Sequence, residues 1–392
     1  MYRTLLLTWR YMTFHKIKTA ILVTCITLTV YLPVAVHLLV DDFQVQLMTR
    51  AETTPLVIGA KGSRFDLVLQ SLYFDAQPPE SIKMNEVSKI RNSGFALPIP
   101  LHVRFRARGF PVVGTTLEYF DFRNLQVGQG RPLAILGDCI LGADVAQKLG
   151  IGPGDYLMSD PENVFDIGGN YPLKMCVTGV LARSHSADDY AVFVDIKTAW
   201  IIEGIGHGHQ NLTDSTDESV VLKRSDDQVV ANAALPQYTE ITKDNLASFH
   251  FHAEPDDLPI TAVIAVPHDE KSGVLLEGRY DTDKANAQLL RPVKVVEEMM
   301  GMVFKVKRIF DANVVLVAVS TALFMVLVIL LSLRLRRREA VTMFHLGCSR
   351  MTIFRLQAAE LIIVLLVSCM LAGLSALATL YYAPYFVRGL LS

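Results

Sequence analysis

Apolar residues are concentrated in three long runs that contain no acidic or basic side chain. Residues 19–40 and 312–333 form two of these runs, and residues 361–383 form the third. A helix needs about 20 apolar residues, at about 1.5 Å rise each, to cross a hydrocarbon layer about 30 Å thick. Buried helices of soluble proteins are usually shorter and carry charges. The pattern therefore predicts three transmembrane helices, at 19–40, 312–333 and 357–383.

The first run is expected to remain in the protein as a membrane anchor. Its apolar stretch is longer than the roughly 7–15 residues of a signal peptide. The sequence Val-Ala-Val-His at 34–37 is also a poor substitute for the small-residue pattern that signal peptidase cleaves.

Basic residues set the predicted orientation of the chain. Arg3, Arg10, Lys16 and Lys18 precede the first run without an acidic residue among them, and six arginines lie in the segment 334–356. Short loops rich in Lys and Arg stay in the cytoplasm. Leu5, Leu6, Trp9 and Met12 recur at helical spacing, which favours an amphipathic helix on the inner membrane surface over a simple charged flank. We expect a cytoplasmic helix at 1–18, an outer segment at 41–311, a cytoplasmic loop at 334–356 and a short outer tail at 384–392.

The outer segment has the pattern of a large α+β domain on helical stalks. Short β-branched runs predict strands at 56–58, 103–106, 111–114, 175–181, 191–194 and 263–266. A helix is predicted at 141–149, whereas the polar stretches 203–218 and 222–227 resemble loops. Residues 41–52 extend the first span as a helix. After Pro292 a helical stripe of Val293, Val296, Met299, Met300, Val303 and Phe304 runs towards the second span.

Composition and motifs restrict the possible functions. Hydrophobic residues make up 51% of the chain, and its net charge is −2. The sequence has no G-x-x-x-x-G-K-[ST] loop for nucleotide phosphates, no G-x-S-x-G and no H-E-x-x-H, so we expect a protein that is not an enzyme. The predicted spans hold almost no ionisable residue, which argues against a path for small ions or polar solutes. Cys139 and Cys176 lie in the outer segment, either bridged or as two free thiols.

The cytoplasmic loop is the most informative segment of the sequence. Residues 336–350 read R-R-R-E-A-V-T-M-F-H-L-G-C-S-R. This order resembles the loop of the MacB/FtsX/LolC superfamily, the type VII membrane subunits of ATP-binding-cassette (ABC) transporters. In that superfamily a short helix docks on a partner ATPase before a glycine break. The positions that match the pattern, and so are expected to couple to an ATPase, are Glu339, Val341, Met343, Phe344, Leu346, Gly347 and Arg350.

A second resemblance to the same superfamily lies in the outer segment. Gly130-Arg131-Pro132-Leu133, the stretch from Ile140 to Asp155, and Val177-Thr178-Gly179-Val180 follow the order found in the MacB-like periplasmic core domain. The expected fold is therefore three transmembrane α-helices with a MacB-like extracytoplasmic α+β domain on stalks.

The resemblance implies mechanotransmission, in which a separate ATPase binding ATP and Mg²⁺ drives movement of the outer domain. The implied partners are that ATPase, a second permease copy or sister subunit in a dimer, membrane lipid and an optional periplasmic adaptor protein, with no nucleic acid. The implied location is the bacterial inner membrane. The large outer domain favours efflux or extraction of a periplasmic substrate over regulation of a hydrolase, by analogy alone.

One feature departs from the family pattern. Members usually have four spans, whereas this sequence ends at Ser392 after the third. Two explanations stay open at this point: a subgroup that lacks the fourth span, or a truncated chain.

The outer segment also holds candidate metal ligands. The paired histidines are His207 with His209 and His250 with His252; His185, Asp188, Asp189 and the run His268-Asp269-Glu270 are further candidates. Residues i and i+2 of a strand point to one face, so His250 and His252 could hold one ion, and imidazole suits Zn²⁺. The alternative is a set of solvated loop histidines.

A second class of function stands beside the transporter subunit. A membrane-tethered signalling or enzymatic outer domain would work without an ATPase. It would need a catalytic set outside the membrane or an output domain inside, and the sequence shows neither pattern.

Overall fold

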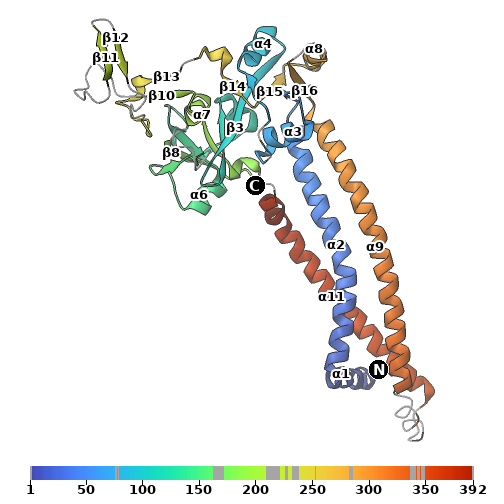
Figure 1. Ribbon diagram of the computed structural model, residues 1–392. Helices are drawn as coiled ribbons and strands as arrows, with labels where there is room; N and C mark the ends of the chain where they lie inside the picture. The colour runs from blue at the N-terminus through green and yellow to red at the C-terminus, as the bar shows by residue number, and fades with distance from the viewer. Residues whose placement is uncertain are drawn as a thin grey trace. The chain divides into compact units, whose positions relative to one another are not determined.

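The computed structural model describes residues 2–390, apart from 76, 78, 162–171, 209–220, 226–227, 232–237, 252, 282–285, 336–340, 342–344 and 346–348 (Figure 1). The chain divides into two compact units. The helical unit comprises Met1–Val45 and Met300–Gly389, and the core unit comprises Gln46–Met299.

Long helices build the helical unit. They are α1 (Tyr2–Phe14), α2 (Lys16–Glu52), α9 (Pro292–Leu335) and α11 (Arg350–Leu390). The far end of α2 and the start of α9 belong to the core unit. The predicted helical extensions at 41–52 and after Pro292 are therefore confirmed.

Two helices in the described part of the chain are long and apolar enough to cross a membrane. They are α2 and residues Phe354–Ala383 within α11. The third predicted span, 312–333, is helical as part of α9. Its role as a span, and the count of three, stay predictions.

Polar side chains join the helices within the helical unit. The hydroxyls of Thr29 on α2 and Thr321 on α9 lie 3.2 Å apart, and those of Tyr31 on α2 and Thr379 on α11 lie 2.9 Å apart. An apolar cluster of Met12, Ile26 and Val364 adds contacts near α1. Hydroxyl contacts of this kind are typical of helices that pack in an apolar solvent.

A mixed sheet forms the centre of the core unit. Ten of the described strands follow the order β16-β1-β15-β3-β4-β9-β6-β8-β5, with β7 paired to β8. Their bounds are β1 (Leu56–Ala60), β3 (Ala96–Ala107), β4 (Phe110–Thr115), β5 (Val127–Gly130), β6 (Asp138–Leu141), β7 (Tyr156–Met158), β8 (Lys174–Leu181), β9 (Val192–Asp195), β15 (Ala262–Pro267) and β16 (Ala287–Leu290). β4 with β9 and β6 with β8 are parallel pairs, and the other neighbours are antiparallel.

Short helices and three two-stranded pairs complete the core unit. The helices are α3 (Arg64–Tyr73), α4 (Asn85–Ser93), α5 (Glu118–Arg123), α6 (Ala143–Leu149), α7 (Ile196–Ile202), α8 (Glu270–Tyr280) and the 3₁₀ turns η1 (Ala187–Tyr190), η2 (Leu246–Ser248) and η3 (Pro255–Asp257). The strand pairs are β2 (Ile82–Lys83) with β14 (Pro259–Ile260), β10 (Gly206–Gly208) with β13 (Phe249–Phe251), and β11 (Val221–Ser225) with β12 (Gln228–Ala231).

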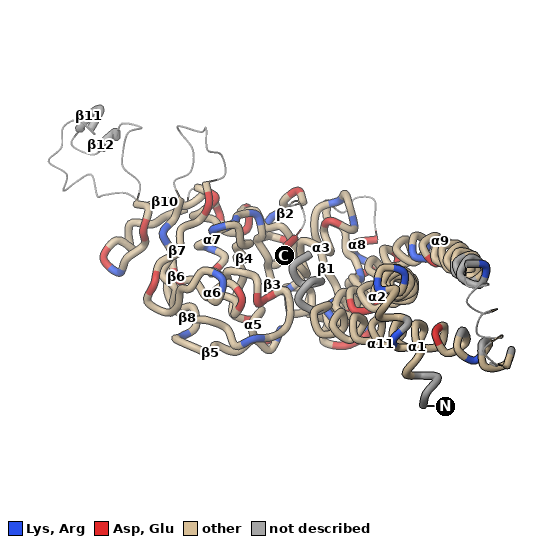
Figure 2. The backbone as a smooth tube through the Cα atoms, turned by 90° about the horizontal axis from the view of Figure 1, so that it is seen from below, with Lys and Arg blue, Asp and Glu red and all other residues tan. Residues whose placement is uncertain are grey.

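Two apolar clusters form the interior of the core unit. One gathers Ile58, Ile260 and Val263 with Trp200, and the other gathers Leu141 and residues of β8 and β9. Acidic and basic residues are interspersed along the chain of this unit (Figure 2). The mixed sheet with flanking helices agrees with the predicted α+β domain.

Most strand predictions in the outer segment are confirmed, and two details are wrong. The helix predicted at 141–149 begins at Ala143, because residues up to Leu141 form the buried strand β6. The stretches predicted as loops at 203–218 and 222–227 contain β10 and β11. Cys139 and Cys176 are free thiols, and burial raises the pKa of Cys139 above its ordinary value.

Candidate functional site

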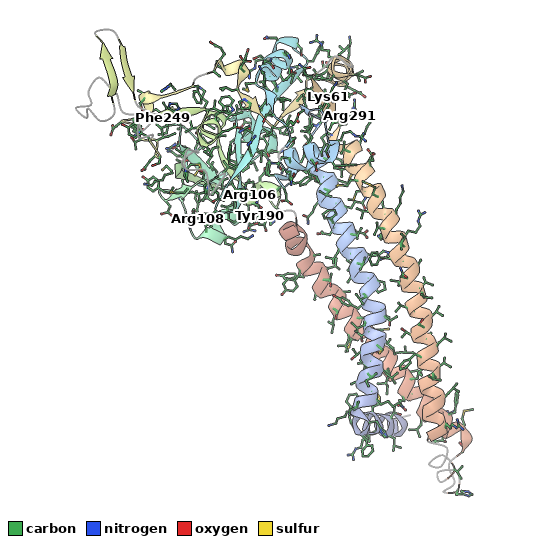
Figure 3. All side chains as sticks on the ribbon, in the orientation of Figure 1. Lys61, Arg106, Arg108, Tyr190, Phe249 and Arg291 are labelled. Atoms are coloured by element: carbon green, nitrogen blue, oxygen red, sulfur yellow. The ribbon has the colours of Figure 1, made fainter. Side chains whose placement is uncertain are left out.

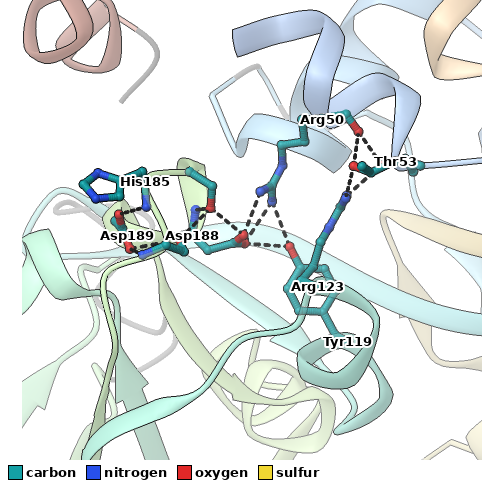
Figure 4. Close-up of polar contacts among 10 residues, drawn as sticks. Arg50, Thr53, Tyr119, Arg123, His185, Asp188 and Asp189 are labelled. Carbon is teal, nitrogen blue, oxygen red and sulfur yellow. Dashed lines mark hydrogen bonds and ion pairs between the residues drawn. The ribbon is translucent and has the colours of Figure 1, made fainter.

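The last turn of α2 is fixed to the core unit through the buried side chain of Arg50. Its guanidinium donates to both carboxylate oxygens of Asp188, at 2.7 and 2.9 Å, and to the hydroxyl of Tyr119 at 2.9 Å (Figure 4). The Tyr119 hydroxyl in turn donates to Asp188 at 2.8 Å. The side chains of Arg50 and Asp188 are only 8% and 2% exposed. A bidentate charged pair of this kind fixes both distance and orientation.

Asp188 is positioned by the tight turn η1. The hydroxyl of Ser186 accepts from the backbone N–H of Asp188 and donates to its carboxylate at 2.9 Å. Gly142, at the N-terminus of α6, lies directly against this turn, and a Cβ there would collide with the carbonyl oxygens of Asp188 and Asp189. The Gly142 N–H donates to the carbonyl of Ala191 at 2.9 Å. Only glycine allows this close approach of α6 to η1.

A second arginine holds the two threonines whose hydroxyls cap the C-terminal end of α2. Arg123, on α5, donates to the hydroxyl of Thr54 at 2.8 Å and to that of Thr53 at 3.3 Å. Both threonine hydroxyls donate to the carbonyl of Arg50, at 2.8 and 3.1 Å. The last carbonyls of a helix have no partner within it. Side chains that follow α2 therefore supply the missing hydrogen bonds.

One turn earlier, α3 contacts the same helix. The hydroxyl of Tyr73 donates to the carbonyl of Leu47 at 2.6 Å, and Leu47 is fully buried. Residues from α3, α5 and η1 thus all hold the last turn of α2. We name the set Arg50, Tyr73, Tyr119, Arg123 and Asp188 the α2 junction.

Burial and neighbouring charges shift the pKa of Asp188, at the α2 junction, in opposite directions. Burial alone would raise the pKa of Asp188, but attraction to Arg50 and Arg123 and hydrogen bonds from Arg50 and Tyr119 lower it to about 2. Burial and the charge of Arg50 lower the pKa of Arg123. Burial also raises the pKa of Tyr119 above its ordinary value, so its hydroxyl keeps the proton that it donates. Asp188 is therefore ionised between two cations. Removing only one partner of the Arg50–Asp188 pair would leave the other charge buried without its partner, which costs much free energy.

The other long helix begins at the neighbouring strand of the sheet. Val57 of β1 pairs with Leu290 of β16, so the strand that follows α2 and the strand that precedes α9 are adjacent. At the start of α9, Val295 and Val296 are buried, and Glu298 pairs with Arg64 of α3 at 3.3 Å. Arg291, labelled in Figure 3, immediately precedes α9 and pairs with Glu277 of α8. Both helices therefore meet the core unit at one edge of its sheet.

Most of the predicted coupling residues cannot be placed. Glu339, Met343, Phe344, Leu346 and Gly347 lie outside the described residues. Val341 is helical and 48% exposed, and Arg350 is the first residue of α11. The Ser349 hydroxyl accepts from the N–H of Thr352 at 3.2 Å, which caps the start of α11. The coupling role of the loop stays a prediction.

The predicted histidine ligands divide in a similar way. His209 and His252 lie outside the described residues, whereas His207 and His250 come together with ring centroids 4.9 Å apart. Asp188 belongs to the α2 junction, and Asp189 accepts from the N–H of His185 at 2.7 Å. Within the described residues no three His, Cys, Asp or Glu side chains lie close enough to hold a metal ion together.

The α2 junction was not predicted from the sequence. The sequence presents Asp188 only as a candidate metal ligand, and Arg50 only as part of a helical extension. The available signal was a lone arginine at the end of a helix, followed directly by two threonines. A basic side chain there is common for electrostatic reasons alone, so that signal did not identify the partner.

Comparison with known protein families defines the class of this protein. The sequence model described as MacB-like periplasmic core domain matches residues 19–239, more than half of the chain. A comparison with curated proteins gives no match. The class is that of ABC-type transporter components that carry a MacB-like extracytoplasmic domain. Within it, the chain belongs to the MacB/FtsX-type permease superfamily, in the family with the MacB-like periplasmic core domain.

Two solved structures were also matched. The periplasmic region of MacB from Actinobacillus actinomycetemcomitans is 10% identical, with 65% of this chain and 97% of that chain covered and a TM-score of 0.36. The extracellular domain of the noncanonic ABC-type transporter YknZ from Gram-positive bacteria is 13% identical, with 60% and 98% covered and a TM-score of 0.32.

Proposed function

We propose that this chain is the membrane subunit of a complex in which a separate cytoplasmic ATPase moves the core unit through α2 and α9. The chain would span the bacterial inner membrane three times, with its N-terminus in the cytoplasm and the core unit in the periplasm. ATP and Mg²⁺ would bind to the partner ATPase. The work done on the core unit would serve efflux or extraction of a periplasmic substrate.

The observation that carries this proposal is the attachment of both helices to one edge of the sheet. The α2 junction fixes the last turn of α2 with buried, charged hydrogen bonds, and β16 leads into α9 from the strand beside β1. Buried, bidentate charged hydrogen bonds fix the distance and orientation of the groups that they join. A shift or rotation of either helix would therefore act directly on the core unit.

The surfaces of the helical unit support its place in a membrane. Val315 and Leu323 on α9 and Leu377 on α11 are 63%, 66% and 64% exposed. Apolar surface of this extent is costly in water but suits lipid. A groove of 740 Å³ in the helical unit is lined by Phe14, Ile17 and Phe324 together with the basic residues Lys16 and Lys18, a combination that suits an acyl chain and an anionic headgroup.

ATPase coupling would lie in the loop 334–356. Apolar side chains on a short helix can dock in a groove of a partner, with arginines at the membrane face. A dimer, formed with a second copy or a sister subunit, would place two such loops against two ATPase subunits. A periplasmic adaptor would contact the core unit.

Substitutions in the loop test the proposal directly. Phe344→Asp and Leu346→Asp should each abolish co-purification of the ATPase from mild detergent, because a carboxylate cannot enter an apolar groove without losing its hydration. Phe344→Leu, which keeps an apolar side chain, is the matched control. Membrane insertion is checked by fractionation, and ATPase activity is measured in proteoliposomes with and without this subunit.

Two results would contradict the proposal. Wild-type ATPase capture and activity in both aspartate variants would remove the loop from the coupling path. Recovery of no ATPase with a well-behaved wild-type chain would instead favour a membrane-tethered outer domain that works alone.

A further inference from the structure

The strand pair β10–β13 brings together two histidine motifs that are far apart in the sequence. Gly206, His207 and Gly208 of β10 pair in antiparallel register with Phe251, His250 and Phe249 of β13. His207 and His250 are therefore directly opposite each other. Side chains of directly paired residues share a face of the sheet, so the two imidazoles are cross-strand neighbours.

The composition of this pair separates its two faces. A Cβ at Gly206 would lie 2.5 Å from the ring of Phe251, and one at Gly208 would lie 2.7 Å from the ring of Phe249. Both phenylalanine rings thus cover the glycines. Successive residues of a strand point to opposite faces, so His207 and His250 lie on the face away from the phenylalanines.

The phenylalanine face is anchored in the core unit. Phe251 packs edge-on against Trp200, with centroids 6.1 Å apart, and Phe249, labelled in Figure 3, lies 6.4 Å from Tyr238. The strand pair is held from this side. The two half-buried imidazoles occupy the other side.

The separation of the two rings suits a shared metal ion. Their centroids are 4.9 Å apart, and their planes are inclined at 65°. A zinc–nitrogen distance of about 2.0–2.1 Å, with the ring centre about 1.1 Å beyond the nitrogen, places two imidazoles of a tetrahedral site about 5 Å apart. The spacing of the two rings is therefore that expected for two imidazoles on one ion.

A hydrogen bond prepares His250 as a ligand. Its Nδ1 lies 3.0 Å from the carbonyl oxygen of Ser248. A carbonyl only accepts, so Nδ1 carries the proton, and the lone pair stays on Nε2. Metal-binding histidines commonly have this arrangement, in which a backbone carbonyl fixes the tautomer and the ring orientation.

We propose that His207 and His250 are two ligands of a binding site for a divalent transition-metal ion of the Zn²⁺ type. Water or further side chains complete the coordination. A bound ion would connect two segments of the core unit that are distant in sequence. This site is independent of ATPase coupling.

Zinc binding to the full-length chain in detergent tests the site. Isothermal titration with Zn²⁺ should show that His207→Ala and His250→Ala each weaken binding by at least about tenfold, since even the loss of an outer-shell partner costs 10- to 100-fold. His268→Ala, at an exposed histidine outside the pair, is the control and should bind as wild type. Wild-type affinity in the double variant His207→Ala/His250→Ala would overturn the proposal.

A spectroscopic measurement covers the case in which the alanine variants fold poorly. Cu²⁺ bound at one equivalent to the wild-type chain should give an electron paramagnetic resonance spectrum with hyperfine coupling to at least two imidazole nitrogens. His207→Gln and His250→Gln should each remove one of these nitrogens. A wild-type spectrum without imidazole coupling would overturn the site whether or not the ATPase binds.

Discussion

At the scale of single residues, the Arg50–Asp188 pair shows why a buried charge can be kept. Removing a carboxylate and a guanidinium from water is costly, and mutual attraction offsets this only when the remaining donors and acceptors are satisfied. Here Tyr119 and Ser186 complete the hydrogen bonds of Asp188. Such a pair contributes little net stability but strongly penalises the loss of one partner. It therefore fixes one arrangement of the last turn of α2.

Truncation of Arg50 should destabilise the core unit strongly. We expect Arg50→Ala to lower the free energy of unfolding by about 3–5 kcal/mol, because Asp188 stays buried without its partner. Thermal unfolding followed by fluorescence of the buried Trp200 measures the change. Lys83→Ala removes the exposed Lys83–Asp257 pair and should change stability by less than about 1 kcal/mol. Equal effects of the two substitutions would contradict the role given to Arg50.

The lowered pKa of Asp188 predicts a specific acid sensitivity. Its pKa is about 2 in the folded protein against an ordinary value of 3.8, so its charge stabilises the folded state above pH 3.8. That contribution, about 2–3 kcal/mol, is lost as the pH falls from about 4 to about 2.

Unfolding temperatures measured between pH 5 and pH 2.5 check this sign. The wild type should lose more stability over that range than Asp188→Asn, which has no proton to gain. The double variant Arg50→Met/Asp188→Leu, an apolar replacement of the pair, should show the same reduced slope. Parallel pH profiles in all three proteins would show that Asp188 does not titrate as proposed.

At the scale of elements, local sequence patterns predicted the individual strands and helices better than they predicted the contacts between them. The β-branched runs at 175–181 and 263–266 became β8 and β15, because a short, buried apolar run and strand propensity agree there. β10 was interpreted as a loop because Gly206-His207-Gly208 has neither apolar character nor strand propensity. The strand forms where the phenylalanine rings of β13 pack directly over its two glycines.

The contacts of the α2 junction could not be predicted from the sequence for a similar reason. Arg50 and Asp188 are 138 residues apart, and no periodicity relates them. The composition of the histidine motifs is visible in the sequence, but the pairing of His207 with His250 depends on strand register. Register between distant segments is fixed by packing on the core, which a single sequence does not reveal.

At the scale of the whole molecule, the proposed topology places the loop 334–356 in the cytoplasm and the core unit outside. Cys348, in that loop, should react with a membrane-impermeant maleimide only after intact cells or spheroplasts are permeabilised. Cys139 should stay unlabelled in both states, because it is fully buried and its raised pKa keeps the thiol protonated.

The labelling is best read by mass spectrometry of peptides, with Cys348→Ser as the negative control. Detergent unfolding should expose Cys139 and serves as the positive control for reagent access. Labelling of Cys348 in sealed cells would reverse the proposed orientation.

The adjacency of β1 and β16 has a consequence for how this architecture can change. The core unit leaves the long helices at Leu56 and returns to them at Leu290, and these positions lie at neighbouring ends of two paired strands. A segment whose ends are neighbours can be excised, exchanged or enlarged without altering the spacing of the helices that carry it. The core unit is thus a replaceable module. A different insert between α2 and α9 would leave the long helices unchanged.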